Sequence, residues 1–96
     1  MEILVAYDVA TDTPEGQRRL RHVARVCQDF GQRVQKSVFE CSVSEMQYEQ
    51  LRKQLVESID EEEDSLRIYR LQMPKEQFVE HYGLDRGVDF HGPLVV

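Results

Sequence analysis

One carboxylate near the N-terminus has the setting of a metal ligand. Asp8 follows the apolar run 3–6, which has the pattern of a strand buried on both faces. A carboxylate directly after such a run is costly unless it lies at the end of the strand and is paired or bound to a cation. The Thr-Asp-Thr-Pro segment 11–14 predicts that the strand ends near Val9. Asp8 is therefore expected at the rim of a sheet, where carboxylates can bind metal ions.

As a metal ligand, Asp8 suits a hard divalent cation. Mg²⁺ prefers oxygen ligands and commonly takes one or two carboxylates together with water and phosphate. One chain supplies a single carboxylate, whereas a two-fold dimer that brought two strand ends together would supply two. Such a cation polarises a phosphoryl group and lowers the pKa of a bound water. The alternative is an aspartate that only forms the turn before the first helix, and the residues alone leave both readings open.

Charge is distributed unevenly along the chain, whose net charge is −6. That value argues against a general coat for nucleic acid. Residues 15–36, however, hold six cations against two acids, whereas residues 40–64 hold nine acids against two bases. A local cationic face binds phosphates even when the rest of the molecule repels them. The candidate nucleic-acid-binding residues are Arg18, Arg21, Arg25, Arg33 and Lys36.

Three of these cations share one side of a predicted helix. Arg18, Arg21 and Arg25 follow one another at helical spacing, opposite the apolar stripe of the same segment. The ordinary alternative is a solvated helix face. The near absence of acids favours phosphate contact, and Arg33 and Lys36 would extend the basic surface beyond the helix.

The remaining polar candidates carry weaker signals. The acidic run 60–64 has no defined ligand spacing, so a solvated loop is predicted there. Ser37 has no recognisable His or Asp partner and is not expected to act as a nucleophile. Phe39 either stacks on a base or belongs to the core or to a dimer interface. No two histidines stand at zinc-ligand spacing.

The composition predicts a small cytoplasmic domain without a membrane segment. Cys27 and Cys41 are isolated thiols, which predicts two reduced core cysteines rather than a disulfide or a metal site. No stretch approaches the roughly 20 apolar residues of a membrane span. Glu2 and Asp8 interrupt the N-terminal apolar run, so no signal peptide is expected. A chain of 96 residues forms one domain of marginal stability, and such a domain often oligomerises.

The elements that must position these residues alternate regularly. Thr13 is a predicted helix N-cap followed by Pro14, and Gly31 ends that helix. A capping box begins at Ser44, and the extended segment before it contains a hairpin or sharp bend near Ser37. The predicted elements are a strand over 2–9, a helix over 14–30, an extended segment over 32–43, a helix over 45–59 and a strand over 65–71. This β-α-β-β-α-β order predicts an α+β, ferredoxin-like sandwich.

The end of the chain differs in character from the rest. We expect residues 1–72 to form the ferredoxin-like domain and residues 73–96 to form a C-terminal extension. The extension ends in Pro-Leu-Val-Val, an apolar end that favours packing over exposure to water. It packs either on its own domain or on the sheet edge of a second subunit, because such a sheet leaves edges that need covering.

Several of these segments together resemble a known family. They are the Tyr-Asp-Val of residues 7–9, the segment 31–41 with its Ser-Val-Phe-Glu core, and the segments 59–60 and 64–69. The chain resembles the smaller of the two CRISPR-associated spacer-acquisition proteins ("Cas two") from its first strand to its last residues. The segment 79–83 resembles the subtype I-C branch of that family.

The resemblance implies a homodimer whose C-terminal strand crosses to the sheet of its partner. It implies a cytoplasmic role in adaptive immunity, in which the dimer bridges two dimers of an integrase protein on spacer DNA. It also implies a metal-dependent endonuclease that acts on single-stranded RNA or double-stranded DNA. The metal-binding aspartate of the family falls on Asp8, its neighbouring aromatic residue on Tyr7, and its serine and phenylalanine on Ser37 and Phe39. Mg²⁺ or another divalent cation would then be shared by the two copies of Asp8.

Three readings of the function remain at this point. The first is a DNA-bridging adaptor without physiological nuclease activity, and the second is a metal-dependent endonuclease. The third is a toxin-type ribonuclease of the same fold from outside CRISPR systems. The Ser-Val-Phe-Glu segment and the Pro-Leu-Val-Val end favour the CRISPR branch over the toxin. The adaptor and the nuclease would both keep Asp8 and the basic helix, so these features do not distinguish the first two readings.

Overall fold

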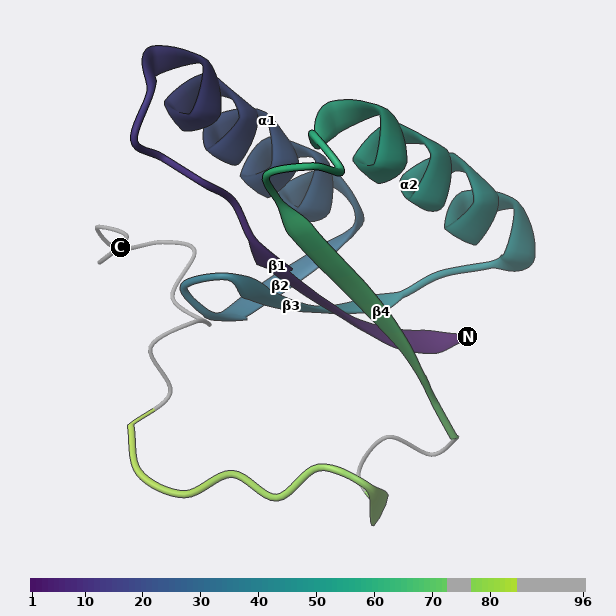
Figure 1. Cartoon of the computed structure of the whole chain (residues 1–96). Helices are drawn as coiled ribbons and strands as arrows, with labels where there is room; N and C mark the ends of the chain where they lie inside the picture. Colours follow the sequence, from purple (N-terminus) through teal and green to yellow (C-terminus); the bar gives the residue numbers. More distant parts are fainter. Residues whose placement is uncertain (73–76, 85–96) are drawn as a thin grey trace.

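The computed structural model describes residues 1–72 and 77–84. The elements are β1 (Glu2–Asp8), α1 (Pro14–Phe30), β2 (Gly31–Gln35), β3 (Val38–Ser42), α2 (Glu45–Ser58) and β4 (Ser65–Leu71). The predicted β-α-β-β-α-β order is confirmed, and the fold is α+β and ferredoxin-like. Both helices lie on the same side of one sheet (Figure 1). No helix among the described residues is long and apolar enough to cross a membrane.

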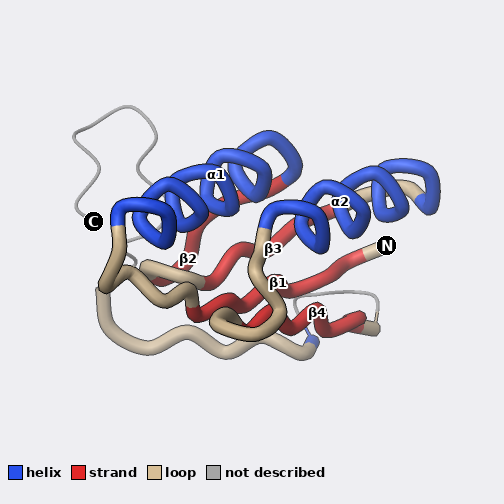
Figure 2. The backbone as a smooth tube through the Cα atoms, turned by 45° about the horizontal axis from the view of Figure 1, so that its top comes forward, coloured by secondary structure: helices blue, strands red, loops and turns tan. Residues whose placement is uncertain are grey.

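The sheet places β1 at its centre. Its strand order is β2-β3-β1-β4 (Figure 2). All neighbouring strands are antiparallel. The β1–β4 ladder begins with Glu2 opposite Leu71 and ends with Asp8 opposite Ser65. Asp8 is therefore the last residue of the central strand, at the rim of the sheet, as the sequence predicts.

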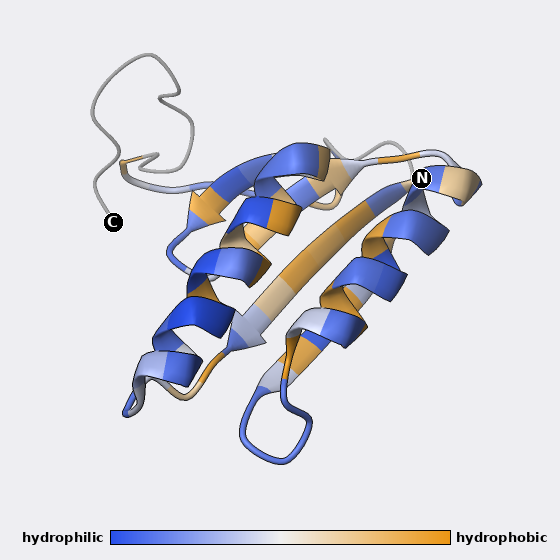
Figure 3. Ribbon diagram, turned by 90° about the horizontal axis from the view of Figure 1, so that it is seen from above, coloured by the Kyte–Doolittle hydropathy of each residue, from blue (hydrophilic) through white to orange (hydrophobic). Residues whose placement is uncertain are grey.

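The prediction that β1 is buried on both faces is wrong for the described chain. Ile3, Val5 and Tyr7 are buried under the helices, whereas Leu4 and Ala6 are only half-buried on the other side. Figure 3 shows the apolar central strand running between the two helices, whose outer surfaces are hydrophilic. An apolar run marks a strand that two layers can cover, but it does not say that one chain supplies both layers.

We call the uncovered side of the sheet the open face. Cross-strand partners point to the same face of a sheet, so its members follow from the ladders. They are Glu2, Leu4, Ala6 and Asp8 on β1, Val38, Glu40 and Ser42 on β3, and Ser65, Arg67, Tyr69 and Leu71 on β4.

Helix α1 begins as predicted and ends for a different reason. The Thr13 hydroxyl caps it by accepting a hydrogen bond from the Gly16 amide at 3.0 Å, and Pro14 follows. Gly31 ends the helix in an extended conformation, and its amide donates to the Cys27 carbonyl. A Cβ at Gly31 would collide with Cys41, so glycine is required there by close packing of β2 on β3. The helix therefore passes into β2 without a loop.

The predicted hairpin near Ser37 is confirmed. Lys36 and Ser37 form the turn between β2 and β3. The register shifts between Arg33 and Gln35, which leaves Val34 as a bulge. One extra residue moves every following side chain to the opposite face.

The predicted capping box of α2 is confirmed, and the helix packs through a narrow stripe. The Gln47 amide donates to the Ser44 hydroxyl at 3.1 Å, and the Ser44 amide donates to the Gln47 side chain at 2.8 Å. The buried residues of the helix are Tyr48, Leu51 and Leu55.

Both cysteines are buried free thiols of the core. Burial is the main cause that raises the pKa of Cys27 to about 12 and that of Cys41 to about 11. Their place agrees with the predicted pair of reduced core cysteines. The two thiols belong to α1 and β3, so they lie where the helix layer meets the sheet.

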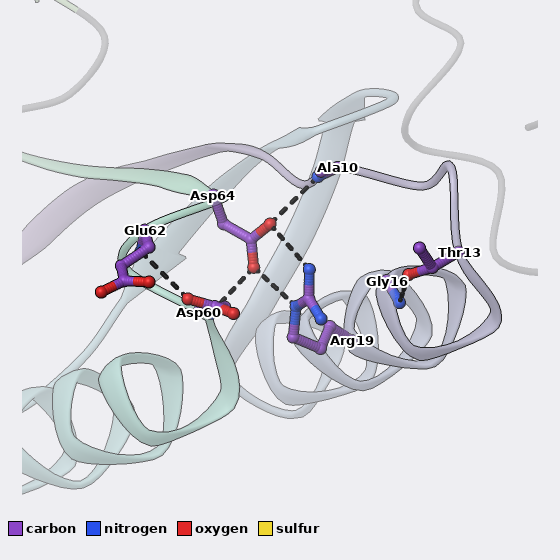
Figure 4. A network of polar contacts seen from close by, with 7 residues as sticks. All are labelled: Ala10, Thr13, Gly16, Arg19, Asp60, Glu62 and Asp64. Carbon is purple, nitrogen blue, oxygen red and sulfur yellow. Dashed lines mark hydrogen bonds and ion pairs between the residues drawn. The ribbon is translucent and has the colours of Figure 1, made fainter.

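The sequence predicts a solvated acidic loop before β4, and this prediction is wrong for Asp64. The Asp64 side chain is fully buried, and it binds Arg19 of α1 through two hydrogen bonds of 2.8 and 3.2 Å (Figure 4). It also accepts the amides of Ala10 at 3.0 Å and Asp60 at 2.9 Å. We call this group of four residues the Arg19–Asp64 latch. It joins the end of β1, the first half of α1 and the start of β4.

The latch holds Asp64 in its charged form. The hydrogen bond from Arg19 is the main cause that lowers the pKa of Asp64 to about 2, and the amides of Asp60 and Ala10 act in the same direction. Burial acts against this shift. A hydrogen-bonded carboxylate that loses its charge would leave the Arg19 guanidinium without its partner.

Replacement of Asp64 is expected to destabilise the domain. Asp64→Asn removes the charge but keeps the size of the side chain, and we expect the free energy of unfolding in urea to fall by about 2 kcal/mol. The exposed Glu62→Gln in the same loop is the matched control and should change it little. The folded-state pKa lies below the ordinary value of 3.8, so the difference between native and Asn proteins should be present above about pH 4 and vanish as the pH falls toward 2. A constant difference across that range would contradict the role given to the charge.

Candidate functional site

Asp8 presents its carboxylate at the end of β1. Its side chain is exposed and lies on the open face, opposite Ser65 of β4. No ion pair to Asp8 is found within residues 1–72 and 77–84. A free carboxylate at the rim of a sheet attracts a cation without first having to break a salt bridge.

The surroundings of Asp8 fit a hydrated cation of the magnesium type. In the described part of the chain, no three His, Cys, Asp or Glu side chains come together as a set of metal ligands. A structural zinc site needs four protein ligands, so that chemistry is not supported by the described residues. Mg²⁺ keeps several waters and is often bound by one or two carboxylates and substrate phosphates. Asp8 fits this second pattern.

Tyr7 lies beside Asp8 in the sequence but on the opposite face of the sheet. Its ring is buried and stacks on Phe39 with the ring centroids 6.3 Å apart. Its amide donates to the Ser37 carbonyl at 3.1 Å, and its hydroxyl donates to the Lys36 carbonyl at 3.5 Å. Burial is the main cause that raises the pKa of Tyr7. Tyr7 thus holds the β2–β3 turn against the end of β1 and keeps its proton.

Ser37 and Lys36 lie near the Asp8 end of the central strand. Ser37 is half-buried in the turn and meets Tyr7 through its backbone, whereas Lys36 is exposed. The structure therefore brings Tyr7, Ser37 and Lys36 together near Asp8. Ser37 acts here as part of the turn, which agrees with the absence of partners for a nucleophilic serine.

Of the two readings of Phe39, the structure supports the core. Phe39 is fully buried opposite Val5, with Tyr7 beside its ring and the Arg33 guanidinium 5.2 Å from its centroid. No exposed face of the ring is left on which a base could stack. Phe39 serves the site as the support beneath Tyr7.

The predicted basic surface divides into two parts. Arg18, Arg21 and Arg25 are exposed on α1, as expected, and Arg18 also lies 3.7 Å from Glu15. Arg33 is different, because its guanidinium covers the Phe39 ring and its Nε atom is buried without a hydrogen-bond partner among the described residues. The Arg33 guanidinium thus lies apart from the exposed arginines of α1, and its binding of nucleic acid stays a prediction. Its edge strand directs the side chain toward the core.

Arg19 and Asp64 are the structural residues near this site that the sequence reasoning missed. Arg19 differs from its neighbours Arg18 and Arg21 in its position on the helix, since it stands four residues before the buried Val23. That spacing places it on the packed side of α1. It was the available signal that this arginine pairs inside the protein rather than facing solvent.

Comparison with known proteins decides the family. The family model described as "CRISPR associated protein Cas2" matches residues 1–79. This chain belongs to the Cas2 family. The resemblance seen in the Cas2-like segments of the sequence is thereby confirmed, whereas subtype I-C stays a prediction.

Curated relatives match this Cas2 chain over its full length. The "CRISPR-associated endoribonuclease Cas2 1" of Moorella thermoacetica is 58% identical over 96 residues, which is 100% of each chain. The "CRISPR-associated endonuclease Cas2" of Halalkalibacterium halodurans is 50% identical over 95 residues, 99% of each chain. The crystal structure of Streptococcus pyogenes Cas2 superposes with a TM-score of 0.77 at 51% identity, covering 86% of this chain and 100% of that chain. The names of these relatives agree with the predicted nuclease.

The place of Phe39 in the core is testable by a conservative change. Phe39→Leu should lower the free energy of unfolding by about 1.5 kcal/mol, because a ring that fills the space between Tyr7 and Arg33 is replaced by a smaller side chain. Urea denaturation measures this change, and nucleic-acid affinity of the folded variant should be unchanged. Unaltered stability with a clear loss of affinity would favour base stacking instead.

Proposed function

We propose that this Cas2 chain works as a homodimer in CRISPR spacer acquisition. In this proposal the dimer bridges two dimers of the integrase on spacer DNA and carries a divalent-metal-dependent endonuclease site built around Asp8. The substrate is a phosphodiester of single-stranded RNA or double-stranded DNA. The observation that carries the proposal is the exposed, unpaired Asp8 carboxylate at the end of the central strand, on the open face.

The open face supports a second copy as the partner. Leu4, Ala6 and Val38 are half-buried there, and Tyr69 is 45% exposed. A sheet with one bare, partly apolar face gains stability when another sheet covers it. A two-fold dimer that faces the ends of β1 together would place two Asp8 carboxylates on one cation. The C-terminal extension 73–96, whose strand is expected to cross to the partner, lies outside the described residues except for residues 77–84.

The residues around Asp8 have separate tasks in this proposal. Asp8 of each subunit would hold Mg²⁺, which when bound supplies Lewis-acid polarisation of the phosphodiester and a more acidic water. Tyr7 and Phe39 keep the β2–β3 turn in place from the helix side of the sheet. Lys36 in that turn is exposed and offers a positive charge to a phosphate near the strand end.

The exposed arginines of α1 support nucleic-acid binding by the same protein. Arg21 and Arg25 form no ion pair within residues 1–72 and 77–84. Cations that are free of internal partners are available to phosphates, and each phosphate neutralised releases counterions. The adaptor role needs such a surface even where no cleavage takes place.

Removal of two charges from α1 should lower the salt dependence of binding. The double variant Arg21→Gln with Arg25→Gln should bind duplex DNA more weakly, and the slope of log K against log salt should fall by about 0.9 for each phosphate that the variant no longer neutralises. Arg52→Gln with Lys53→Gln on α2 removes the same net charge and is the matched control. If both double variants change the affinity for DNA and its salt slope equally, the arginines of α1 form only a solvated helix face.

Neutralisation of Asp8 should separate cleavage from assembly. Asp8→Asn removes the charge that attracts Mg²⁺, so Mg²⁺-dependent cleavage of RNA and of duplex DNA should fall by orders of magnitude. Folding, dimerisation and assembly with the integrase should persist, because Asp8 is exposed at a strand end. The exposed Asp12→Asn in the next loop is the control. Cleavage that survives Asp8→Asn and still requires Mg²⁺ would place the metal elsewhere.

A further inference from the structure

A second side-chain oxygen lies beside Asp8 on the open face. Asp8 and Ser65 are the last pair of the β1–β4 ladder, and both are exposed. Side chains of directly opposed residues in antiparallel strands point to the same face, with Cβ atoms about 5 Å apart. No hydrogen bond of the Ser65 hydroxyl is found in the described part of the chain. Each subunit therefore presents a carboxylate and a free hydroxyl side by side.

The Arg19–Asp64 latch holds the backbone next to both Asp8 and Ser65. Asp64 directly precedes Ser65, and the Ala10 amide that it binds follows Asp8 by two residues. The start of β4 is thus fastened to the chain just beyond β1 by a buried, charged group. Groups that are held in place before a ligand arrives bind it without an ordering cost.

The other neighbours on the open face do not compete for Asp8. Ala6 and Val38 are apolar, and Arg67, two residues beyond Ser65, donates a hydrogen bond to the Tyr69 hydroxyl at 3.1 Å. Arg67 therefore has a partner further along its own strand. In the β1–β4 ladder the polar residue paired with Asp8 is Ser65. The exposed Lys36 lies at the same strand end on the β3 side, where its charge suits a phosphate rather than a cation.

We propose that the Ser65 hydroxyl is the second oxygen that each subunit offers to the cation held by Asp8, through a hydrogen bond with a metal-bound water. The inference rests on the proposed Asp8 site and adds a positioning residue to it. Contact through water follows from the reluctance of Mg²⁺ to lose its hydration shell. In a symmetric pair, the two carboxylates neutralise the ion, and the two hydroxyls fix the orientation of its waters.

Cation binding tests this role independently of cleavage. Mn²⁺ is titrated into the full-length protein, and the free ion is followed by electron paramagnetic resonance. Ser65→Ala should weaken Mn²⁺ binding about tenfold, the lower end of the usual effect of outer-shell partners. Ser65→Thr keeps the hydroxyl and should keep the native affinity. Ser42→Ala is the matched control, because Ser42 is an exposed serine of the open face at the other end of β1.

The outcomes separate this inference from the proposed function. Weaker binding by Ser65→Ala with native affinity in Ser65→Thr and Ser42→Ala supports the role of the hydroxyl. Native affinity in Ser65→Ala, together with weaker binding by Asp8→Asn, overturns the inference and leaves the Asp8 site standing. Native affinity in Asp8→Asn overturns both. A lower melting temperature of Ser65→Ala without recovery in Ser65→Thr assigns Ser65 to the fold and overturns its role toward the cation.

Discussion

The buried charge of Asp64 is the constraint on which the geometry of the site depends. A carboxylate with no exposed surface must be satisfied completely, and Asp64 draws its partners from three separate segments through Arg19, Ala10 and Asp60. These segments are the exit from β1, the first half of α1 and the approach to β4. The rim that carries Asp8 is therefore fixed by electrostatics, whereas the middle of the sheet is fixed by apolar packing.

The two faces of the sheet have different roles: the helix side forms the core, and the open face carries the proposed site. Under the helices, Ile3, Val5 and Phe39 belong to the buried apolar core, and Tyr7 closes this core at the Asp8 end. On the open face, half-buried apolar side chains lie beside polar ones, and Asp8 stands among them. Successive residues of β1 point to opposite faces of the sheet. Each residue that packs in the core is therefore followed by one that faces the proposed partner and cation.

Local signals in the sequence predicted the helices, strands and turns well. Contacts between segments far apart in the sequence were not predicted. The caps at Thr13 and Ser44 and the turn near Ser37 depend on residues a few positions apart. The pairing of Arg19 with Asp64 joins residues 45 positions apart, and a run of acids gives no sign of which one is buried. Arg33 was placed with the basic helix because charge counts do not reveal that its strand directs it over Phe39. The position of Asp8 at the strand end was predicted correctly because its signal, a charge at the end of an apolar run, is local as well. Its binding of a metal ion stays a prediction.

The reactivity of the two buried thiols reports on opening of the core. The sequence contains only Cys27 and Cys41 as cysteines, and they lie at the junction of α1 with the sheet. With pKa values of about 12 and about 11, they carry almost no thiolate at neutral pH, and burial also denies access to reagents. Alkylation therefore requires an opening of the fold that exposes a thiol. The rate of labelling of the native protein is therefore a direct measure of how often this core opens, without any introduced probe.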